Sequence, residues 1–318
     1  MLLVAVTALC LQSAFLPQTN VAALRPLYEQ ALARRRAEFG PGDLRTAQAA
    51  RDLGLFLAGL KEASAARTAL QEAIRIEEHL LGAADRQTLA DLAELAAVSN
   101  PAESLPLWKR VALAGDAELA IRARMALGPI YLSTGNRAAA TAAYREALSL
   151  LETASGLDSA GAPAILSALA GILEAPEAIP LLLRALAAGR TAQGPRHPAN
   201  AALENSLAER LLEVGRAEEA LRAATDAVAI QQEALGQQHP LVARAMLTLA
   251  RALETQREFP RAERLYLLAI EIDATAYGQH NAVTLADARL LAKFLRAQGR
   301  AGDAAQVEKR FGFTAPGK

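Results

Sequence analysis

A spacing of 42 residues recurs along the chain and limits its possible folds more than any other feature. Gly194, Gly236 and Gly278 follow one another at this interval. Gly40 and Gly82, near the other end of the chain, have the same separation. Repetition with a period of about 20–50 residues is typical of proteins in which similar units stack along one axis. The spacing therefore predicts an elongated array of repeats.

Each period predicts a pair of helices. In one unit, leucine and alanine recur at three- and four-residue spacing in two runs, residues 199–214 and 217–235, which places them on one face of each helix. Gly215, between the runs, suits the left-handed backbone at a helix C-terminus. His239-Pro240 suits the start of the next unit, because proline loses no hydrogen bond at a first helical position. One pair cannot cover its own apolar face, so neighbouring units must stack.

The composition agrees with packed helices and excludes several classes of function. Hydrophobic residues make up 52% of the 318 residues and aromatic residues only 4%, which favours alanine- and leucine-rich helices over strands or disorder. Lysine plus arginine equals aspartate plus glutamate, at 34 each, so no net positive charge draws the chain to nucleic acid or to an anionic membrane. The single cysteine, Cys10, excludes an intrachain disulfide and a cysteine-based metal site.

Residues 1–23 have two interpretations, and the sequence leaves both open. The uncharged apolar run "MLLVAVTALCLQSAF" is too short for a membrane span, and Val21 and Ala23 are small residues that suit cleavage before Leu24. A signal peptide would make the protein periplasmic or secreted, with no stable membrane span in the mature chain. Alternatively, the same run forms the first helix of the array, and the protein is cytoplasmic.

The segment "HPLVARAMLTLARALETQREFPRAERLYLLAIEIDATAYG" resembles the tetratricopeptide repeat, in the 42-residue variety found in kinesin light chains. Residues at the signature positions of the repeat are Leu249, Ala250, Ala262, Tyr266 and Ala269. The resemblance is strongest over residues 194–300 and covers most of the chain after residue 24. It implies an all-α fold, a right-handed α-solenoid of about seven stacked antiparallel helix pairs.

The array is predicted to cover residues 24–312, followed by a C-terminal tail at 313–318. Two units depart from the regular pattern. Around residues 97–108 and 172–182 the turn is shorter and contains prolines, so we expect the superhelix to be irregular there.

The sequence offers no recognisable catalytic or cofactor-binding pattern. It contains no glycine-rich phosphate loop, no nucleophile elbow and no zinc-protease helix. His197, His239 and His280 lie in equivalent turns, about 10–20 Å apart if the units stack, so they are interpreted as turn residues and not as ligands of a shared metal. Acidic residues are expected on solvated helix surfaces near arginine, as Glu218 is near Arg222. We therefore predict no enzyme, no cofactor and no metal site.

The resemblance implies that the first helix of each unit lines a concave groove, which in this family holds an extended peptide or a partner helix. The positions carried over to this sequence are Asn205, Glu209, Arg244, Arg251, Arg289, Lys293 and Arg296. The last three also share one helix face by their spacing alone. Arginine pairs with carboxylates through two parallel hydrogen bonds, so the patch is predicted to bind acidic side chains or a free C-terminal carboxylate. Alternatively, these are ordinary solvated charges.

The predicted function is a non-enzymatic scaffold for protein–protein interaction, which binds a peptide or a partner protein in the concave groove. A second hypothesis is a structural or assembly factor of the cell envelope that oligomerises through the ends of its repeats. An exposed apolar end helix would favour that hypothesis, since terminal repeats normally carry a polar cap. The neutral charge balance and the scarcity of aromatic residues disfavour nucleic-acid binding.

Overall fold

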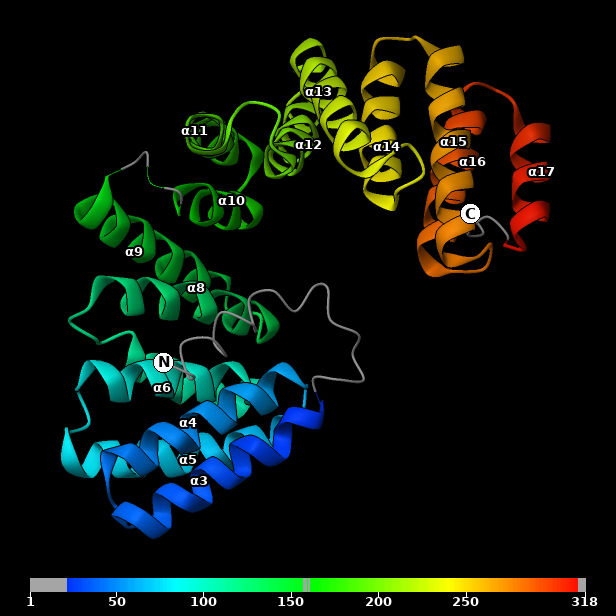
Figure 1. The fold of residues 1–318 in the computed structure, drawn as a ribbon. Helices are drawn as coiled ribbons and strands as arrows, with labels where there is room; N and C mark the ends of the chain where they lie inside the picture. The colour runs from blue at the N-terminus through cyan, green and yellow to red at the C-terminus, as the bar shows by residue number, and fades with distance from the viewer. Residues whose placement is uncertain (1–21, 157–158, 160, 314–318) are drawn as a thin grey trace. The chain divides into compact units, whose positions relative to one another are not determined.

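The computed structural model describes residues 22–156, 159 and 161–313, and all regular structure in these residues is helical (Figure 1). The predicted all-α fold is confirmed. Contacts divide the chain into two compact units, Met1–Leu150 and Leu151–Lys318. Most of the predicted signal peptide and of the predicted C-terminal tail lies outside the described residues.

The first unit contains six complete helices and most of a seventh within its described residues. A short 3-10 helix, η1, precedes them at Ala22–Leu24. The helices are α3 (Arg25–Phe39), α4 (Leu44–Gly59), α5 (Ala63–Leu80), α6 (Arg86–Ala97), α7 (Pro101–Val111), α8 (Ala117–Ser133) and α9 (Arg137–Ser155). From α3 to α8, each helix packs against the next one along the chain, for example α4 against α5 and α6 against α7. This is the stacking of helix pairs that the period predicts.

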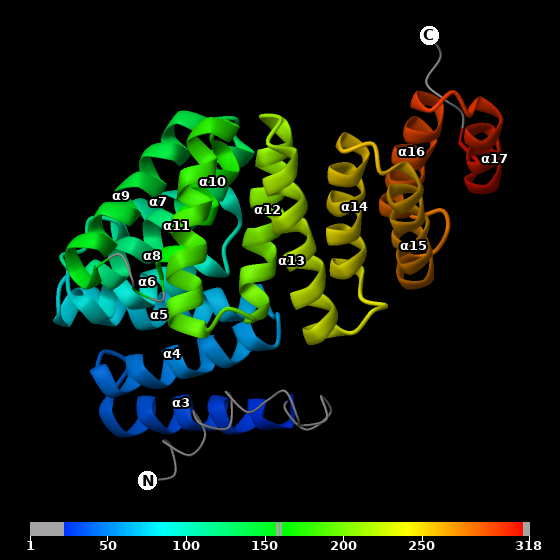
Figure 2. The same ribbon diagram turned by 90° about the horizontal axis from the view of Figure 1, so that it is seen from above.

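The second unit repeats the same arrangement. Its described helices are α10 (Ala162–Ile172), α11 (Ala175–Gln193), α12 (Pro198–Glu213), α13 (Ala217–Leu235), α14 (Pro240–Thr255), α15 (Phe259–Tyr277), α16 (Ala282–Ala297) and α17 (Ala301–Phe311). Figure 2 shows α12, α13 and α14 one after another in chain order, and neighbouring helices of this unit are in contact throughout. Both units are therefore built as an α-solenoid.

Side chains cap the first helices of successive pairs at positions 42 residues apart. His197 and His239 accept a hydrogen bond from the backbone N–H two residues further on, at 3.2 Å in both cases, and Asn281 does the same at 2.9 Å. His197 and His239 are therefore turn residues, as predicted. Gly215, between the two helices of one pair, has a φ of 75°, a conformation that residues with a Cβ rarely adopt.

Removing one of these caps gives a direct test of their contribution. We expect Asn281→Ala to lower the free energy of unfolding by about 1 kcal/mol, because the N–H of Val283 loses its partner. Urea denaturation followed by circular dichroism measures the change. Asn281→Asp keeps an acceptor oxygen and places a negative charge at the helix N-terminus, so it should retain the stability. Equal losses in the two variants would contradict this role.

Of the two units predicted to have shorter turns, one has a turn of ordinary length: three residues separate α6 from α7, as they separate α12 from α13, whereas two separate α10 from α11. Each of the two units contains a short helix. Helix α7 has 11 residues with Pro106 inside it, and α10 also has 11 residues, whereas α12, α14 and α16 have 16 each. Asn100 caps α7, with its side chain accepting a hydrogen bond from the N–H of Glu103 at 3.0 Å. The prolines therefore accompany a local shortening of the pair, and the helices themselves persist.

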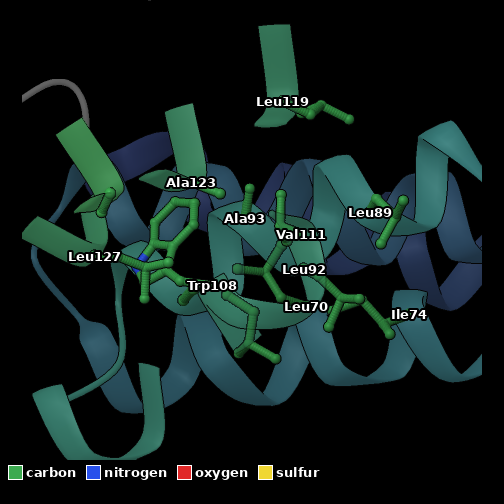
Figure 3. Packing of buried hydrophobic residues seen from close by; sticks show 13 residues of the cluster. Leu70, Ile74, Leu89, Leu92, Ala93, Trp108, Val111, Leu119, Ala123 and Leu127 are labelled. Carbon is green, nitrogen blue, oxygen red and sulfur yellow. The ribbon is translucent and has the colours of Figure 1, made fainter. Parts of the chain in front are cut away.

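The core of the first unit centres on the only tryptophan of the chain, Trp108 of α7. Figure 3 shows its ring near Ala93 of α6 and near Ala123 and Leu127 of α8. Alanine at the surrounding positions lets three helices approach the ring closely. The opposite end of the chain is polar: α17 carries Glu308, Lys309 and Arg310, as the terminal repeat of an array requires.

Candidate functional site

The first helices of the second unit carry polar residues in equivalent positions. Glu209 of α12, Arg251 of α14 and Lys293 of α16 follow one another at 42 residues. Arg251 and Lys293 are exposed, and Glu209 is half-buried. The hydroxyl of Thr248 on α14 donates to Glu209 Oε1 at 3.4 Å, so this face of α12 lies against α14. We call the face formed by Glu209, Arg244, Arg251 and Lys293 the candidate groove.

A cleft of about 160 Å³ opens on this face between α12 and α14. Its lining residues are Ala202, Asn205, Ser206, Glu209, Gln231, Leu241, Arg244 and Ala245. The Asn205 amide donates to Glu209 Oε1 at 3.0 Å. Glu209 therefore accepts hydrogen bonds from both helices and is held against the wall of the cleft. Arg244 is the exposed cation at its edge.

Two buried amide groups in the cleft wall are incompletely satisfied. Asn205 Oδ1 and Gln231 Oε1 have no hydrogen-bond partner among the described residues. A buried acceptor without a partner costs about 1–3 kcal/mol. Both amides can present either an oxygen or an NH₂ group after rotation about one torsion, which is the pair of functions that a peptide backbone needs from a binding surface.

The cations of the candidate groove are not neutralised by neighbouring carboxylates. Arg244, Arg251 and Lys293 form no salt bridge within the described part of the chain. Elsewhere in the same unit, some exposed arginines are paired, as Arg196 is with Glu233 at 2.8 Å and Arg184 with Glu152 at 3.0 Å, whereas Arg222 and Arg264 on the second helices form no salt bridge with the described residues. An unpaired guanidinium keeps all its donors available, so this face can bind a carboxylate without breaking an internal ion pair.

Of the three cations predicted to share one face of α16, two lie outside the candidate groove. Arg289 and Arg296 correspond, 42 residues earlier, to Leu247 and Glu254, and Leu247 packs into the core toward the next repeat. The guanidinium of Arg289 lies 5.1 Å from the ring centroid of Phe313, and Arg296 pairs with Glu308 of α17. These two arginines therefore lie on the terminal face of the array. Lys293 alone of the three is equivalent to Arg251.

Sequence reasoning missed Gln231 because the search was restricted to first helices, and Gln231 lies on α13. It also expected acidic residues on solvated surfaces, and this expectation is wrong for several of them. Glu204 is buried beside Arg190, and burial raises the pKa of its carboxyl. The burial of Glu204 could have been predicted from its position, because it lies between Leu203 and Leu207 on the apolar stripe of α12.

The described residues hold no cluster of three or more histidine, cysteine, aspartate or glutamate side chains with the arrangement of a metal site. In the same part of the chain, each helix is either too short or too polar to cross a bilayer. A second cleft, of about 200 Å³, lies between α11, α12 and α13. Leu207 and Leu211 line it, and Arg216 in its lining is ion-paired with Glu219.

Family models described as tetratricopeptide repeat match residues 121–150 and 202–275. Among curated proteins, none matches the sequence significantly. A crystal structure of nearly identical TPR-like repeats from a putative kinesin light chain of Podosopora anserina is 22% identical, with a TM-score of 0.53, and covers 60% of this chain and 93% of that chain.

Two further solved structures share the fold. BtubC (BKLC) from P. vanneervenii is 19% identical with a TM-score of 0.58, over 69% of this chain and 92% of that one. A Rap protein complexed with Competence and Sporulation Factor is 15% identical with a TM-score of 0.55, over 85% of this chain and 76% of that one. Such repeats form scaffolds for protein–protein interaction. The family models and the stacked helix pairs agree, and the chain contains tetratricopeptide repeats at residues 121–150 and 202–275.

Proposed function

We propose that the candidate groove binds an acidic segment of a partner protein, either acidic side chains or a free C-terminal carboxylate. The observation that carries this proposal is the set of three exposed cations, Arg244, Arg251 and Lys293, that have no internal salt bridge in the described structure. The likeness to a Rap protein complexed with Competence and Sporulation Factor supports a fold of this type as a ligand-binding scaffold.

In this proposal, the cations of the groove bind carboxylates and the amide side chains bind the peptide backbone. Arg244 and Arg251 supply planar guanidinium groups that pair with a carboxylate through two hydrogen bonds, and Lys293 adds a third positive charge. Asn205 and Gln231 line the cleft beside them and offer amide groups to the peptide backbone. Because the cations are exposed, salt should weaken binding, since the Debye length at physiological ionic strength is about 8 Å.

The test is a comparison of labelled peptides of about ten residues that differ in net charge and in whether the C-terminus is free or amidated. Fluorescence polarisation measures their binding to the full chain. Acidic peptides should bind more tightly than neutral ones, and the Arg244→Glu/Arg251→Glu variant should lose about tenfold or more in affinity, because a hydrogen bond to a charged group contributes about 1.5–3 kcal/mol.

A matched variant controls for the change in net charge. Arg222 and Arg264 are exposed on the second helices α13 and α15, away from the candidate groove, and Arg222→Glu/Arg264→Glu changes the charge by the same amount. We expect this variant to bind acidic peptides about as the wild type does. If it loses as much affinity as the α14 variant, or if acidic peptides bind no better than basic ones, the groove is not the site.

A further inference from the structure

Two buried carboxyl groups lie on α15 and α16, which pack against each other, and each affects the pKa of the other. Asp273 of α15 is 2% exposed and Asp287 of α16 is 6% exposed. Asp273 Oδ1 and Asp287 Oδ2 have no hydrogen-bond partner among the described residues. Ionised carboxylates only accept hydrogen bonds, so two of them in one buried place repel each other. The arrangement is satisfied when one of them keeps a proton and donates it to the other.

The same pairing occurs once more, at the other end of the chain. Glu77 of α5 and Asp91 of α6 are buried and precede Asp273 and Asp287 by 196 residues each. Both pairs join the second helix of one repeat to the first helix of the next. The repeat itself does not require them, because the interface between α13 and α14 has Gln231 and Ala245 at these positions.

The two pairs differ in their surroundings. At the first pair, the Arg51 guanidinium lies 3.7 Å from Asp91, and the Gln87 amide donates to Asp91 at 2.9 Å. The residues 196 positions later are Leu247 and Val283, which carry neither charge nor donor. The carboxylates of Asp85 and Glu94, which also act on the first pair, are replaced by Asn281 and Leu290. The charged residues that act on the first pair therefore have no charged counterparts at the second pair.

The protonation of the second pair follows from these surroundings. Burial first, and then Asp273, raise the pKa of Asp287 to about 7. Burial also raises the pKa of Asp273, against the hydrogen bond from Asp287, so Asp287 holds the proton. No other titratable group that the structure describes on α14, α15, α16 or α17 contributes to either pKa. At the first pair, burial also raises the pKa, to about 7 for Glu77 and to about 6 for Asp91, although Arg51 counteracts the rise at both carboxyls.

We propose that Asp273 and Asp287 form a proton-dependent clasp between the last two repeats. One shared proton holds α15 against α16, and its loss places two negative charges in a buried site that contains no cation. The interface then loosens. Since α16 also carries Lys293, the clasp sets the position of the last cation of the candidate groove relative to α14.

The direction of the pH effect is fixed by the raised pKa. The folded chain holds the proton of Asp287 up to about pH 7, whereas the unfolded chain loses it near the ordinary value of 3.8. The folded state therefore binds more protons between these values, and its stability falls as the pH rises through that window. The clasp is closed in mildly acidic solution and opens as the solution becomes neutral to alkaline.

Hydrogen–deuterium exchange of the full chain at about pH 5.5 and about pH 8, corrected for the intrinsic rate, tests the clasp. Amides at the end of α15 and in α16 should lose about tenfold or more of their protection at the higher pH, since one pKa unit corresponds to a factor of ten. Asp287→Asn supplies a permanent donor to Asp273, so it should abolish this loss. Glu77→Gln, at the first pair, should leave it unchanged.

The proposal is overturned if protection of α15 and α16 is the same at both pH values, or if the loss persists in Asp287→Asn. Should that variant fail to fold, the wild type still decides the question through the carboxyl carbon resonances of its aspartates. A titration midpoint near neutral pH that is assigned to Asp287 supports the clasp, and assignment is needed because burial also raises the pKa of Asp91 at the first pair to about 6. Midpoints near the ordinary value for every aspartate rule it out.

Discussion

Replacing Trp108 with alanine should lower the free energy of unfolding of the first unit by about 3–5 kcal/mol, the usual cost of truncating a buried aromatic side chain. The ring is 5% exposed and fills the space between α6, α7 and α8 (Figure 3). Alanines 93 and 123 on the neighbouring helices are too small to fill the cavity that the truncation leaves. A loss of this size is a large part of the stability of an ordinary domain.

Chemical denaturation followed by circular dichroism measures this loss, because the variant has no tryptophan left for fluorescence. Leu113→Ala is the matched control. Leu113 lies just after α7 and is 85% exposed, so its truncation should change the free energy of unfolding by less than about 0.5 kcal/mol. If the two variants lose the same amount, the ring does not hold these helices together.

Helix positions follow well from the sequence wherever the 42-residue period is intact. The runs predicted at 199–214 and 217–235 correspond to α12 and α13, which span Pro198–Glu213 and Ala217–Leu235. The prediction succeeds because each repeat combines three local signals that agree: an apolar stripe, a capping residue and a turn glycine. These signals depend on near neighbours in the chain, and one sequence is enough to read them.

The residues that line the groove are harder to predict from the sequence than the helices are. Spacing on one helix correctly places Arg289, Lys293 and Arg296 on one face of α16. It cannot say which part of that face a further repeat would cover. In the structure, α17 and Phe313, two residues beyond its end, contact the two arginines, while Lys293 keeps the position equivalent to Arg251. Assignment to a groove therefore requires the register between helices as well as the period within one.

The buried carboxyl pairs were misread for a related reason. Pairing with arginine on helix surfaces is the expected role of acidic residues in such a sequence, but it does not apply to all of them. Asp273 and Asp287 lie 14 residues apart, on two different helices, and neither has a basic residue three or four positions away. Their contact arises only when one repeat stacks on the next. The detectable signal is the recurrence of a second acidic pair, Glu77 and Asp91, with the same separation.

Tyr266 of α15 plays the corresponding role to Trp108 in the second unit. It is 2% exposed, and its ring centroid lies 5.4 Å from that of Phe294 on α16. Its hydroxyl donates to Glu254 of α14 at 3.0 Å. Burial, followed by the nearby charge of Glu254, raises the pKa of the hydroxyl, so it stays protonated and continues to donate across the physiological range. One side chain therefore connects three helices.

We expect Tyr266→Ala to lower the free energy of unfolding of the second unit by about 3–5 kcal/mol, and Tyr266→Phe by only about 1 kcal/mol. The first variant removes both the ring and the hydrogen bond, whereas the second keeps the ring and removes only the hydrogen bond to the half-buried Glu254. Urea denaturation of the two variants and of the wild type separates these contributions. A loss in Tyr266→Phe as large as in Tyr266→Ala would mean that the hydrogen bond to α14, and not aromatic packing against α16, holds the last repeats together.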